Sequence, residues 1–157
     1  MPLASVESAY TDLVTSVFST PIAFKAWFAS VAAFFAIVQV LTGARIFGKL
    51  TGIVPVPPPR VNRIHRSTGR IAVLLTLPVA FHCVFILGFQ TDDARVLAHS
   101  VLGSFIYGVF AVKVFFVRDR DHPRWVVPLV GGTLFTVLAL LWSTSSVWYF
   151  TQVRFGF

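Results

Sequence analysis

Long apolar stretches separated by short polar segments dominate this chain. Four of them reach the roughly 20 residues that a helix needs to cross the hydrocarbon core of a bilayer, at about residues 26–47, 68–89, 96–117 and 126–150. The pattern therefore predicts an all-α integral membrane protein, a four-helix bundle in a lipid bilayer that forms a single transmembrane domain over residues 1–157.

The segment over residues 1–25 has a different character. It carries two acidic residues and one basic residue, Lys25, whereas a secretory signal needs a basic start before an apolar centre, so we predict no signal peptide. Apolar residues recur at helical spacing from Val6 to Phe18, which is typical of a short amphipathic helix in the membrane interface. An ordered tail without that role is the alternative.

Composition supports the membrane assignment. Hydrophobic residues make up 56% of the chain and charged residues 12%, with a mean hydropathy of +0.80, which excludes an ordinary soluble domain. The net charge of +7 would suit nucleic acid, but the basic residues gather at the membrane boundaries of two loops. We therefore expect no nucleic-acid partner.

The distribution of those basic residues predicts the orientation. Ten of the 13 Lys and Arg residues flank the first and third loops, and the exceptions are Lys25, Arg95 and Arg154. Because cytoplasmic loops are enriched in basic residues, both of these loops are predicted to be cytoplasmic and both termini to lie outside. We expect a multi-pass protein of a bacterial cytoplasmic membrane.

The connecting segments suggest how the helices pack. The proline run from Pro55 to Pro59 should lie extended, with Ser67 or Thr68 capping the second span. This spacing would allow the first two spans to be non-neighbours, whereas the two shorter turns favour sequential contact among the last three. Ser100, Ser104 and Gly108 form a small-residue stripe suited to close helix contact, within the bundle or in an oligomer.

Two intramembrane histidines, His82 and His99, are the strongest candidates for a functional site, because ionisable residues within a membrane usually have a function. His82 lies about 12 Å before the second turn and His99 about 7 Å after it, at roughly 1.5 Å per residue. Two axial imidazoles at similar depth could hold a haem b in apolar surroundings. Gly103, one turn below His99, would leave room for the flat ring.

Two other interpretations of this pair stay open. The histidines could bind another metal or relay protons, or they could only form hydrogen bonds between helices. Haem ligation also requires helix axes further apart than the usual separation of about 8–10 Å. Pro78 removes one helical hydrogen bond four residues before His82, and the resulting bend could separate the helices.

The rest of the chain offers little other chemistry. We find no phosphate-binding loop, nucleophile elbow or cysteine cluster, and the single cysteine, Cys83, is expected to be a small buried hydrophobe. His65 and His122 are expected at the cytoplasmic interface without a cofactor role. The sequence leaves open whether the protein is an enzyme.

The segment from His65 to Ile71, His-Arg-Ser-Thr-Gly-Arg-Ile, precedes an apolar helix that ends near His82. It resembles the opening of the haem-bearing helix in ferric reductase-like and related transmembrane cytochromes b, over about forty residues. The resemblance implies haem and electron transport. Those proteins carry two histidines on each of two helices, whereas Val79, Val112 and Lys113 occupy the corresponding positions here, so a complete two-haem pathway is not expected.

Over its whole length the chain resembles small four-span actinobacterial membrane proteins of unknown function. The segments that carry this resemblance are Phe81-His82-Cys83, residues 95–103 and residues 141–148. That resemblance implies a fold but no activity.

We therefore expect a membrane cytochrome b-like electron-transfer protein in which His82 and His99 hold one haem b near the outer face. No nucleotide-binding domain is visible, so a quinol or a redox protein is the expected partner. The alternative is a non-catalytic structural or assembly subunit of a membrane complex.

Overall fold

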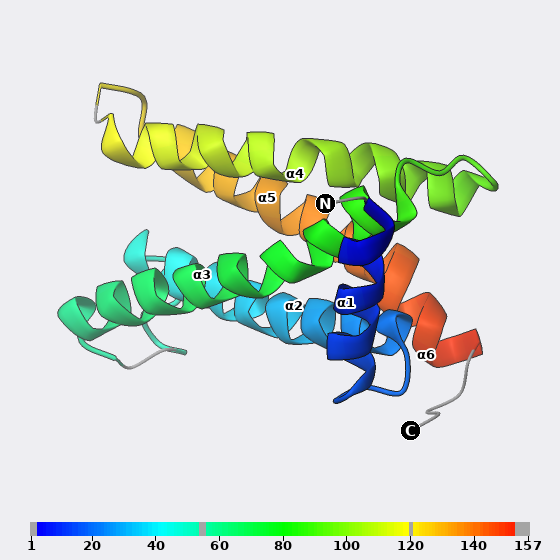
Figure 1. Cartoon of the computed structure of the whole chain (residues 1–157). Coiled ribbons are helices and arrows are strands. Elements are labelled where there is room, and N and C mark those ends of the chain that lie inside the picture. The colour runs from blue at the N-terminus through cyan, green and yellow to red at the C-terminus, as the bar shows by residue number, and fades with distance from the viewer. Residues whose placement is uncertain (1–2, 54–55, 120, 153–157) are drawn as a thin grey trace.

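The computed structural model describes residues 3–53, 56–119 and 121–152 of the protein (Figure 1). Pro55, Arg120 and Arg154, which entered the sequence predictions, lie outside these ranges. The described residues form helices and connecting segments without any strand. The all-α prediction is confirmed.

Four helical stretches are long and apolar enough to cross a membrane, and this confirms a four-span, multi-pass architecture. Two of these stretches change from α-helix to π-helix along their length. In order, they are α2 (Pro21–Ile46), α3 (Pro58–Phe81) with η1 (His82–Leu87), α4 (Ala94–Arg118), and α5 (Val126–Trp142) with η2 (Ser143–Val147) and α6 (Trp148–Gln152).

A short helix, α1 (Leu3–Thr15), precedes the spans and confirms the helix predicted from the N-terminal periodicity. Figure 1 shows it running across α2 and η1, near the end of the bundle that also carries α6 and the start of α4. We call this end the terminal end. Val14 of α1 is buried, whereas Leu13 is exposed, so one side of α1 covers the bundle.

The central helix of the bundle is α2. Small side chains let other helices approach it closely, and Ala23, Ala26, Ala32 and Ala36 are all buried. It packs most extensively against α3 and next against α5. The proline-rich linker would allow the first two spans to lie apart, but the alanine face of α2 favours contact, and the two spans are neighbours.

The contact between α2 and α3 also includes polar groups. The Gln39 side-chain amide donates to the backbone carbonyl of His65 and to the Thr68 hydroxyl, each at 2.6 Å. Gly69 permits this approach, since a Cβ there would lie 2.9 Å from the Gln39 Oε1. Hydrogen bonds across apolar helices add to the association that close packing provides.

In contrast, α3 and η1 do not form a closely packed pair with α4 among the described residues, although α4 packs against α5. Sequential contact is thus confirmed for α4 and α5 and wrong for α3 and α4. The connection between α3 and α4 includes Gly88 at φ +68°, a left-handed conformation that glycine adopts without strain. The Tyr107 hydroxyl of α4 donates to the Thr76 hydroxyl of α3 at 3.1 Å, and this bond links the two helices although they are not closely packed.

The start of α3 differs from the prediction. The helix begins at Pro58, with Pro57 at the N-cap and no side-chain cap, rather than at Ser67 or Thr68. Proline is tolerated in a first helical turn because its missing N–H would have no partner there. The proline run therefore starts the helix instead of remaining extended throughout.

Two π-helical segments lie at the terminal end. Pro78 stays inside α3, and the chain becomes π-helical four residues later, at His82. The second segment, η2, contains the serine and threonine cluster, where hydroxyls donate to carbonyls four residues earlier, as with Ser143 to Ala139 at 2.8 Å. Such segments often occur at functional sites.

Candidate functional site

His82 is one of the most deeply buried polar side chains at the terminal end. It stands at the start of η1 and is only 2% exposed. Its Nδ1 lies 3.0 Å from the Tyr10 hydroxyl of α1. Its Nε2 is buried and has no hydrogen-bond partner among the described residues. Because a buried polar atom normally has a partner, this nitrogen is a candidate ligand for a bound group.

Aromatic contacts explain why Tyr10 reaches this position. The Tyr10 ring packs against Phe24 of α2 at 6.5 Å and against Phe81 of α3 at 5.5 Å between centroids. Burial and the neighbouring Cys83 raise the pKa of the Tyr10 phenol above its usual value. The phenol therefore stays protonated and can either donate to His82 or accept from it.

His99 is positioned by a different span. Its Nδ1 lies 2.9 Å from Oγ1 of Thr144 in η2. The Thr144 hydroxyl donates to the Leu140 carbonyl at 2.8 Å, so it accepts from a protonated Nδ1. The lone pair of His99 then lies on Nε2, which is the tautomer that a metal-ligating histidine needs when its other nitrogen donates to a supporting group.

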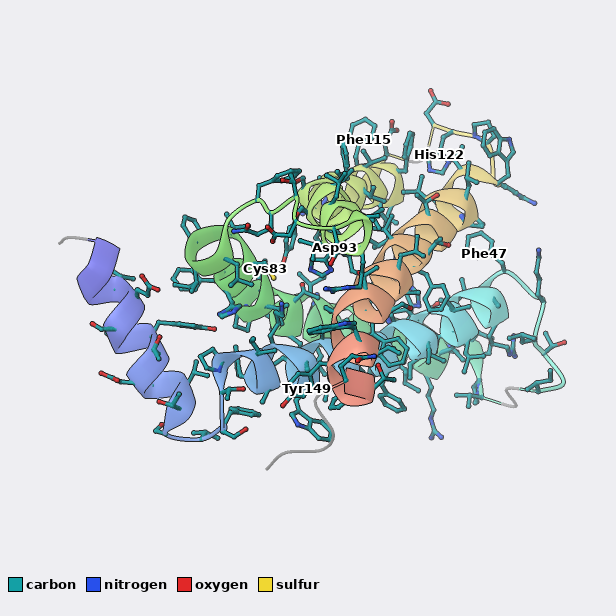
Figure 2. All side chains as sticks on the ribbon, turned by 90° about the vertical axis from the view of Figure 1, so that its right-hand side faces the viewer. Phe47, Cys83, Asp93, Phe115, His122 and Tyr149 are labelled. Carbon is teal, nitrogen blue, oxygen red and sulfur yellow. The ribbon has the colours of Figure 1, made fainter. Side chains whose placement is uncertain are left out.

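Two basic residues lie near the start of their helices, Arg95 in α4 and Lys25 in α2. Arg95 donates to the Thr144 carbonyl at 2.8 Å, forms an ion pair with Asp93 at 3.6 Å and covers the Trp148 ring at 4.3 Å. Lys25 lies in the second turn of α2 and is partly buried. The site therefore draws on α1, α2, α3 with η1, α4 and η2. Figure 2 looks toward the terminal end, where Cys83, Asp93 and Tyr149 are labelled.

The donor chemistry of His82 and His99 is that of axial ligands to a haem iron. His82 and His99 belong to the two spans that are not closely packed, as a porphyrin between them requires. One nitrogen of each imidazole is engaged by a hydroxyl, which leaves the other for an axial bond. Within the described ranges, no group of three or more histidine, cysteine or acidic residues could hold a bare metal ion.

The structure places Gly103 at the contact between α4 and α5. A Cβ at that position would lie 3.9 Å from Cδ2 of Leu141. Gly103 therefore lies against the span that carries Thr144, and its role beside a porphyrin stays a prediction.

The two remaining histidines lie toward the other end of the bundle. His65 bonds through Nδ1 to Thr42 of α2 at 2.8 Å. His122 closes the connection between α4 and α5, with its Nε2 2.6 Å from the Phe116 carbonyl. Among the described residues, neither His65 nor His122 forms a hydrogen bond with His82 or His99.

Sequence reasoning did not link two contributors to the site, Tyr10 and Thr144, with the histidines that they contact. The polar cluster in the last span was a signal for Thr144, because hydroxyls in an apolar helix can bond across to another helix. The structure also corrects the interpretation of the small-residue stripe. Ser104 and Gly108 are exposed, and nothing lies within 4 Å of a Cβ built on Gly108, so this part of the stripe does not pack inside the chain.

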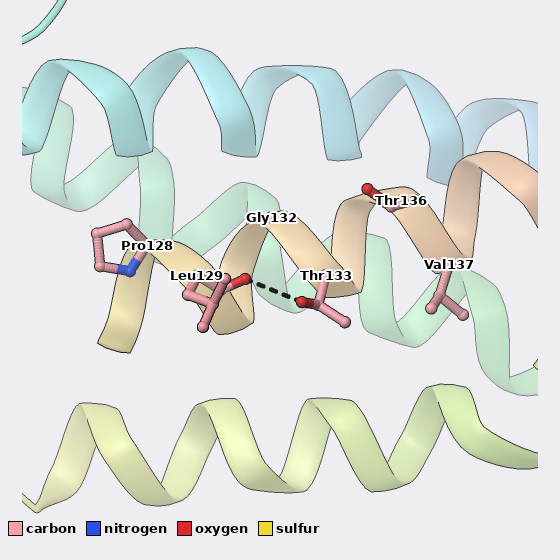
Figure 3. Close-up of a pocket in the computed structure, with 6 residues that line it drawn as sticks. All are labelled: Pro128, Leu129, Gly132, Thr133, Thr136 and Val137. Atoms are coloured by element: carbon pink, nitrogen blue, oxygen red, sulfur yellow. Dashed lines mark hydrogen bonds between the residues drawn. The ribbon is translucent and has the colours of Figure 1, made fainter. Parts of the chain in front are cut away.

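Shallow grooves lie elsewhere on the surface. One is formed by α5 alone, from Pro128 to Val137 (Figure 3), and another runs between α4 and α5 with Phe105 and Gly108 in its lining. Their side chains are apolar or hydroxyl-bearing, and the Thr133 hydroxyl bonds to its own helix at 3.1 Å. These grooves contain no ionisable or metal-ligating side chain.

Comparison with known proteins places the chain in one family. A family model described as a family of unknown function (DUF6529) matches residues 4–157, so the chain belongs to that family. No curated protein matches the chain, and no solved structure matches it.

Proposed function

We propose that this member of the DUF6529 family is a cytochrome b-like electron-transfer protein that holds one haem b between His82 and His99. The observation that carries the proposal is the Nε2 atom of His82, which is buried without a hydrogen-bond partner among the described residues. Burying an unpaired polar atom is costly, and an iron–nitrogen bond would remove that cost.

The hydrogen bonds around both imidazoles support the same function. The Tyr10 hydroxyl of α1 orients the His82 ring, and the Thr144 hydroxyl of η2 orients the His99 ring. Such supporting bonds fix the tautomer and the ring orientation of a metal ligand. The haem would supply one-electron exchange between ferric and ferrous iron, while the chain holds and orients it and limits the access of water.

The wider setting follows from the same proposal. The site lies at the terminal end, which the charge distribution predicts to face outward from a bacterial cytoplasmic membrane. A quinol or a small redox protein would exchange electrons with it there. The partial resemblance of residues 65–103 to ferric reductase-like cytochromes b is consistent with this proposal.

A second function is favoured by the exposed small residues of α4. Ser104 and Gly108 are exposed and could pack against a helix of another protein, as expected of a structural or assembly subunit. This alternative makes no use of the unpartnered nitrogen of His82, and we therefore rank it second.

Alanine variants of the four histidines test the proposal. The protein is purified from haem-sufficient cells, and bound haem is quantified as its pyridine complex. His82→Ala and His99→Ala should each lose the low-spin spectrum, because the iron needs both axial imidazoles. His65→Ala and His122→Ala should keep it, since neither side chain bonds to His82 or His99. Retention of the wild-type spectrum by His82→Ala or His99→Ala would overturn the assignment.

A further inference from the structure

We propose that one face of α3 binds a single anionic phospholipid of the membrane. Three of its residues, Arg63, Arg66 and Arg70, would hold the phosphate, while Leu74 and Leu77 would lie along the acyl chains. We call these five residues the lipid-binding face. The proposal makes no use of the haem, and it lies at the end of the bundle opposite the terminal end.

The five side chains form one row along the helix. They follow one another at intervals of three or four residues, and residues at this spacing lie on the same side of an α-helix. All five are exposed, with Leu74 at 63% and Leu77 at 48%. The row therefore changes from charged to apolar along a single open surface.

The opposite side of α3 is the one that packs within the bundle. Val61 is buried, and His65 and Thr68 bond to side chains of α2. Thr76 bonds to α4. Because an α-helix has 3.6 residues per turn, these four positions fall on the side of α3 away from the row. The lipid-binding face therefore points out of the bundle, where lipid surrounds the protein.

The three arginines of this face lack a counter-charge from the protein. Helix α3 contains no acidic residue, and the ion pair that the described residues form joins Arg95 to Asp93 instead. Side chains three or four residues apart on a helix have Cβ atoms about 5–6 Å apart, so two neighbouring guanidinium groups can reach one phosphate. Arginine binds phosphate through paired hydrogen bonds.

The length of the span places the arginines at the level of the lipid headgroups. The stretch Pro58–Leu87 has 30 residues, which is about 45 Å at roughly 1.5 Å per residue, whereas the hydrocarbon core is about 30 Å thick. The start of α3, at the end of the bundle away from α1 and α6 (Figure 1), therefore extends beyond the core. The leucines follow one and two turns deeper, where acyl chains lie.

This order of side chains favours a phospholipid over an acidic segment of another protein. Both ligands would satisfy the arginines, but only an amphiphile would also cover Leu74 and Leu77. The basic residues around the first loop predict that this end faces the cytoplasm, so the lipid would belong to the cytoplasmic leaflet. Basic clusters beside a span attract anionic lipids there.

Native mass spectrometry of the full chain in detergent tests the proposal. The protein is titrated with phosphatidylglycerol and with phosphatidylcholine of the same acyl chains. Wild type should bind one phosphatidylglycerol per chain, about tenfold or more tightly than phosphatidylcholine. Equal binding of the two lipids by wild type would overturn the proposal.

Two triple variants with the same loss of charge locate the site. The first carries Arg63→Gln, Arg66→Gln and Arg70→Gln. The control carries Lys49→Gln, Arg118→Gln and Arg124→Gln, which are exposed residues at the same end but outside the lipid-binding face. The first variant should lose the preference for phosphatidylglycerol and the control should keep it. Equal losses in both would show a diffuse attraction and would overturn the proposal.

A third variant keeps the charge that membrane insertion requires. Lysine at positions 63, 66 and 70 preserves the three charges but not the planar guanidinium groups. It should bind phosphatidylglycerol more weakly than wild type, and equal binding would contradict the assignment of the phosphate to paired arginine bonds. This variant also tests the proposal if the glutamine variant fails to insert or fold.

Competition with water-soluble anions identifies the ligand. Neither glycerol phosphate nor polyglutamate should displace phosphatidylglycerol from wild type, because neither has acyl chains for Leu74 and Leu77. Displacement by glycerol phosphate would show that the face recognises a free phosphate group. Displacement by polyglutamate would assign the face to an acidic protein segment. Either result would overturn the phospholipid proposal, and neither would affect the histidine assignment.

Discussion

The Thr144 hydroxyl lies 2.9 Å from Nδ1 of His99 and joins η2 of the last span to α4. The same hydroxyl donates to the Leu140 carbonyl of its own helix. While it donates to this carbonyl, the Thr144 hydroxyl accepts a hydrogen bond from the Nδ1–H of His99. This contact fixes the imidazole with its Nε2 lone pair available for a ligand.

Removal of this hydroxyl should weaken haem binding. In Thr144→Val the side chain keeps its shape, but His99 loses its hydrogen-bond acceptor. Loss of such a supporting bond typically costs about 10–100-fold in metal affinity, and we expect a loss of haem affinity of roughly that size. Thr144→Ser keeps the hydroxyl and is the matched control. Haem titration of the purified apoproteins measures the effect, and equal affinity in Thr144→Val and wild type would contradict the orienting role.

Gly69 should be required for the contact between α2 and α3. In Gly69→Ala the new Cβ would lie 2.9 Å from Gln39 Oε1 and would displace that amide from its two partners, at about 1 kcal/mol for each hydrogen bond. Alanine favours a helix over glycine by roughly 1 kcal/mol, so the net loss of stability should be about 1 kcal/mol.

Gly132→Ala is the control for this prediction, because nothing lies within 4 Å of the added Cβ. It should keep or raise the stability through helix propensity alone. Denaturation in detergent compares the two variants, and an equal or higher stability of Gly69→Ala would show that Gln39 moves without cost.

His122 should stabilise the connection between α4 and α5 in its protonated form. The carbonyls of Pro123 and Phe116 accept from its two ring nitrogens and raise the pKa of His122 above 6.5. Because the pKa of His122 is higher in the folded state, the stabilisation is complete at pH values below the unfolded-state pKa. It is lost as the pH rises through the folded-state pKa.

A titration of the His122 ring by NMR measures this effect. The midpoint should lie above 6.5. Protection factors in residues 121–125, which are corrected for the intrinsic rise of amide exchange with pH, should fall above that midpoint, and His122→Asn should remove this fall. A midpoint at or below 6.5 would contradict the role of the two carbonyls.

The orientation in the membrane can be tested with tags. Basic residues around the first and third loops predict that both termini face outward. A tag at either end should be accessible from outside intact cells, whereas a tag near Arg60 should be accessible only after the membrane is permeabilised. The reverse pattern would place the histidine site at the cytoplasmic face.

The number and position of the spans could be predicted from the sequence because length and apolarity alone decide whether a segment can cross a bilayer. The periodicity of the first residues likewise predicted α1. Helix α3 extended ten residues beyond its predicted start, from 68 back to Pro58, because prolines fit a first helical turn.

Helix neighbours could not be predicted from the connecting segments. The long linker between α2 and α3 joins closely packed helices, since Gly69 and the buried alanines of α2 allow a close approach. The short connection between α3 and α4 joins helices that are not closely packed. Loop length limits separation but does not determine which faces pack.

The candidate site was predicted in part. His82 and His99 were identified because ionisable side chains are rare in apolar spans. Tyr10 could not be linked to His82, from which it is separated by 72 residues.

The central claim is that His82 and His99 hold one haem b, and the most direct test is the absorption spectrum of the purified wild-type protein from haem-sufficient cells. Spectra are recorded before and after reduction with dithionite and then with carbon monoxide. Two axial imidazoles should give sharp low-spin bands in the reduced state that carbon monoxide leaves unchanged. A colourless protein, after the haem supply has been verified, would contradict the account.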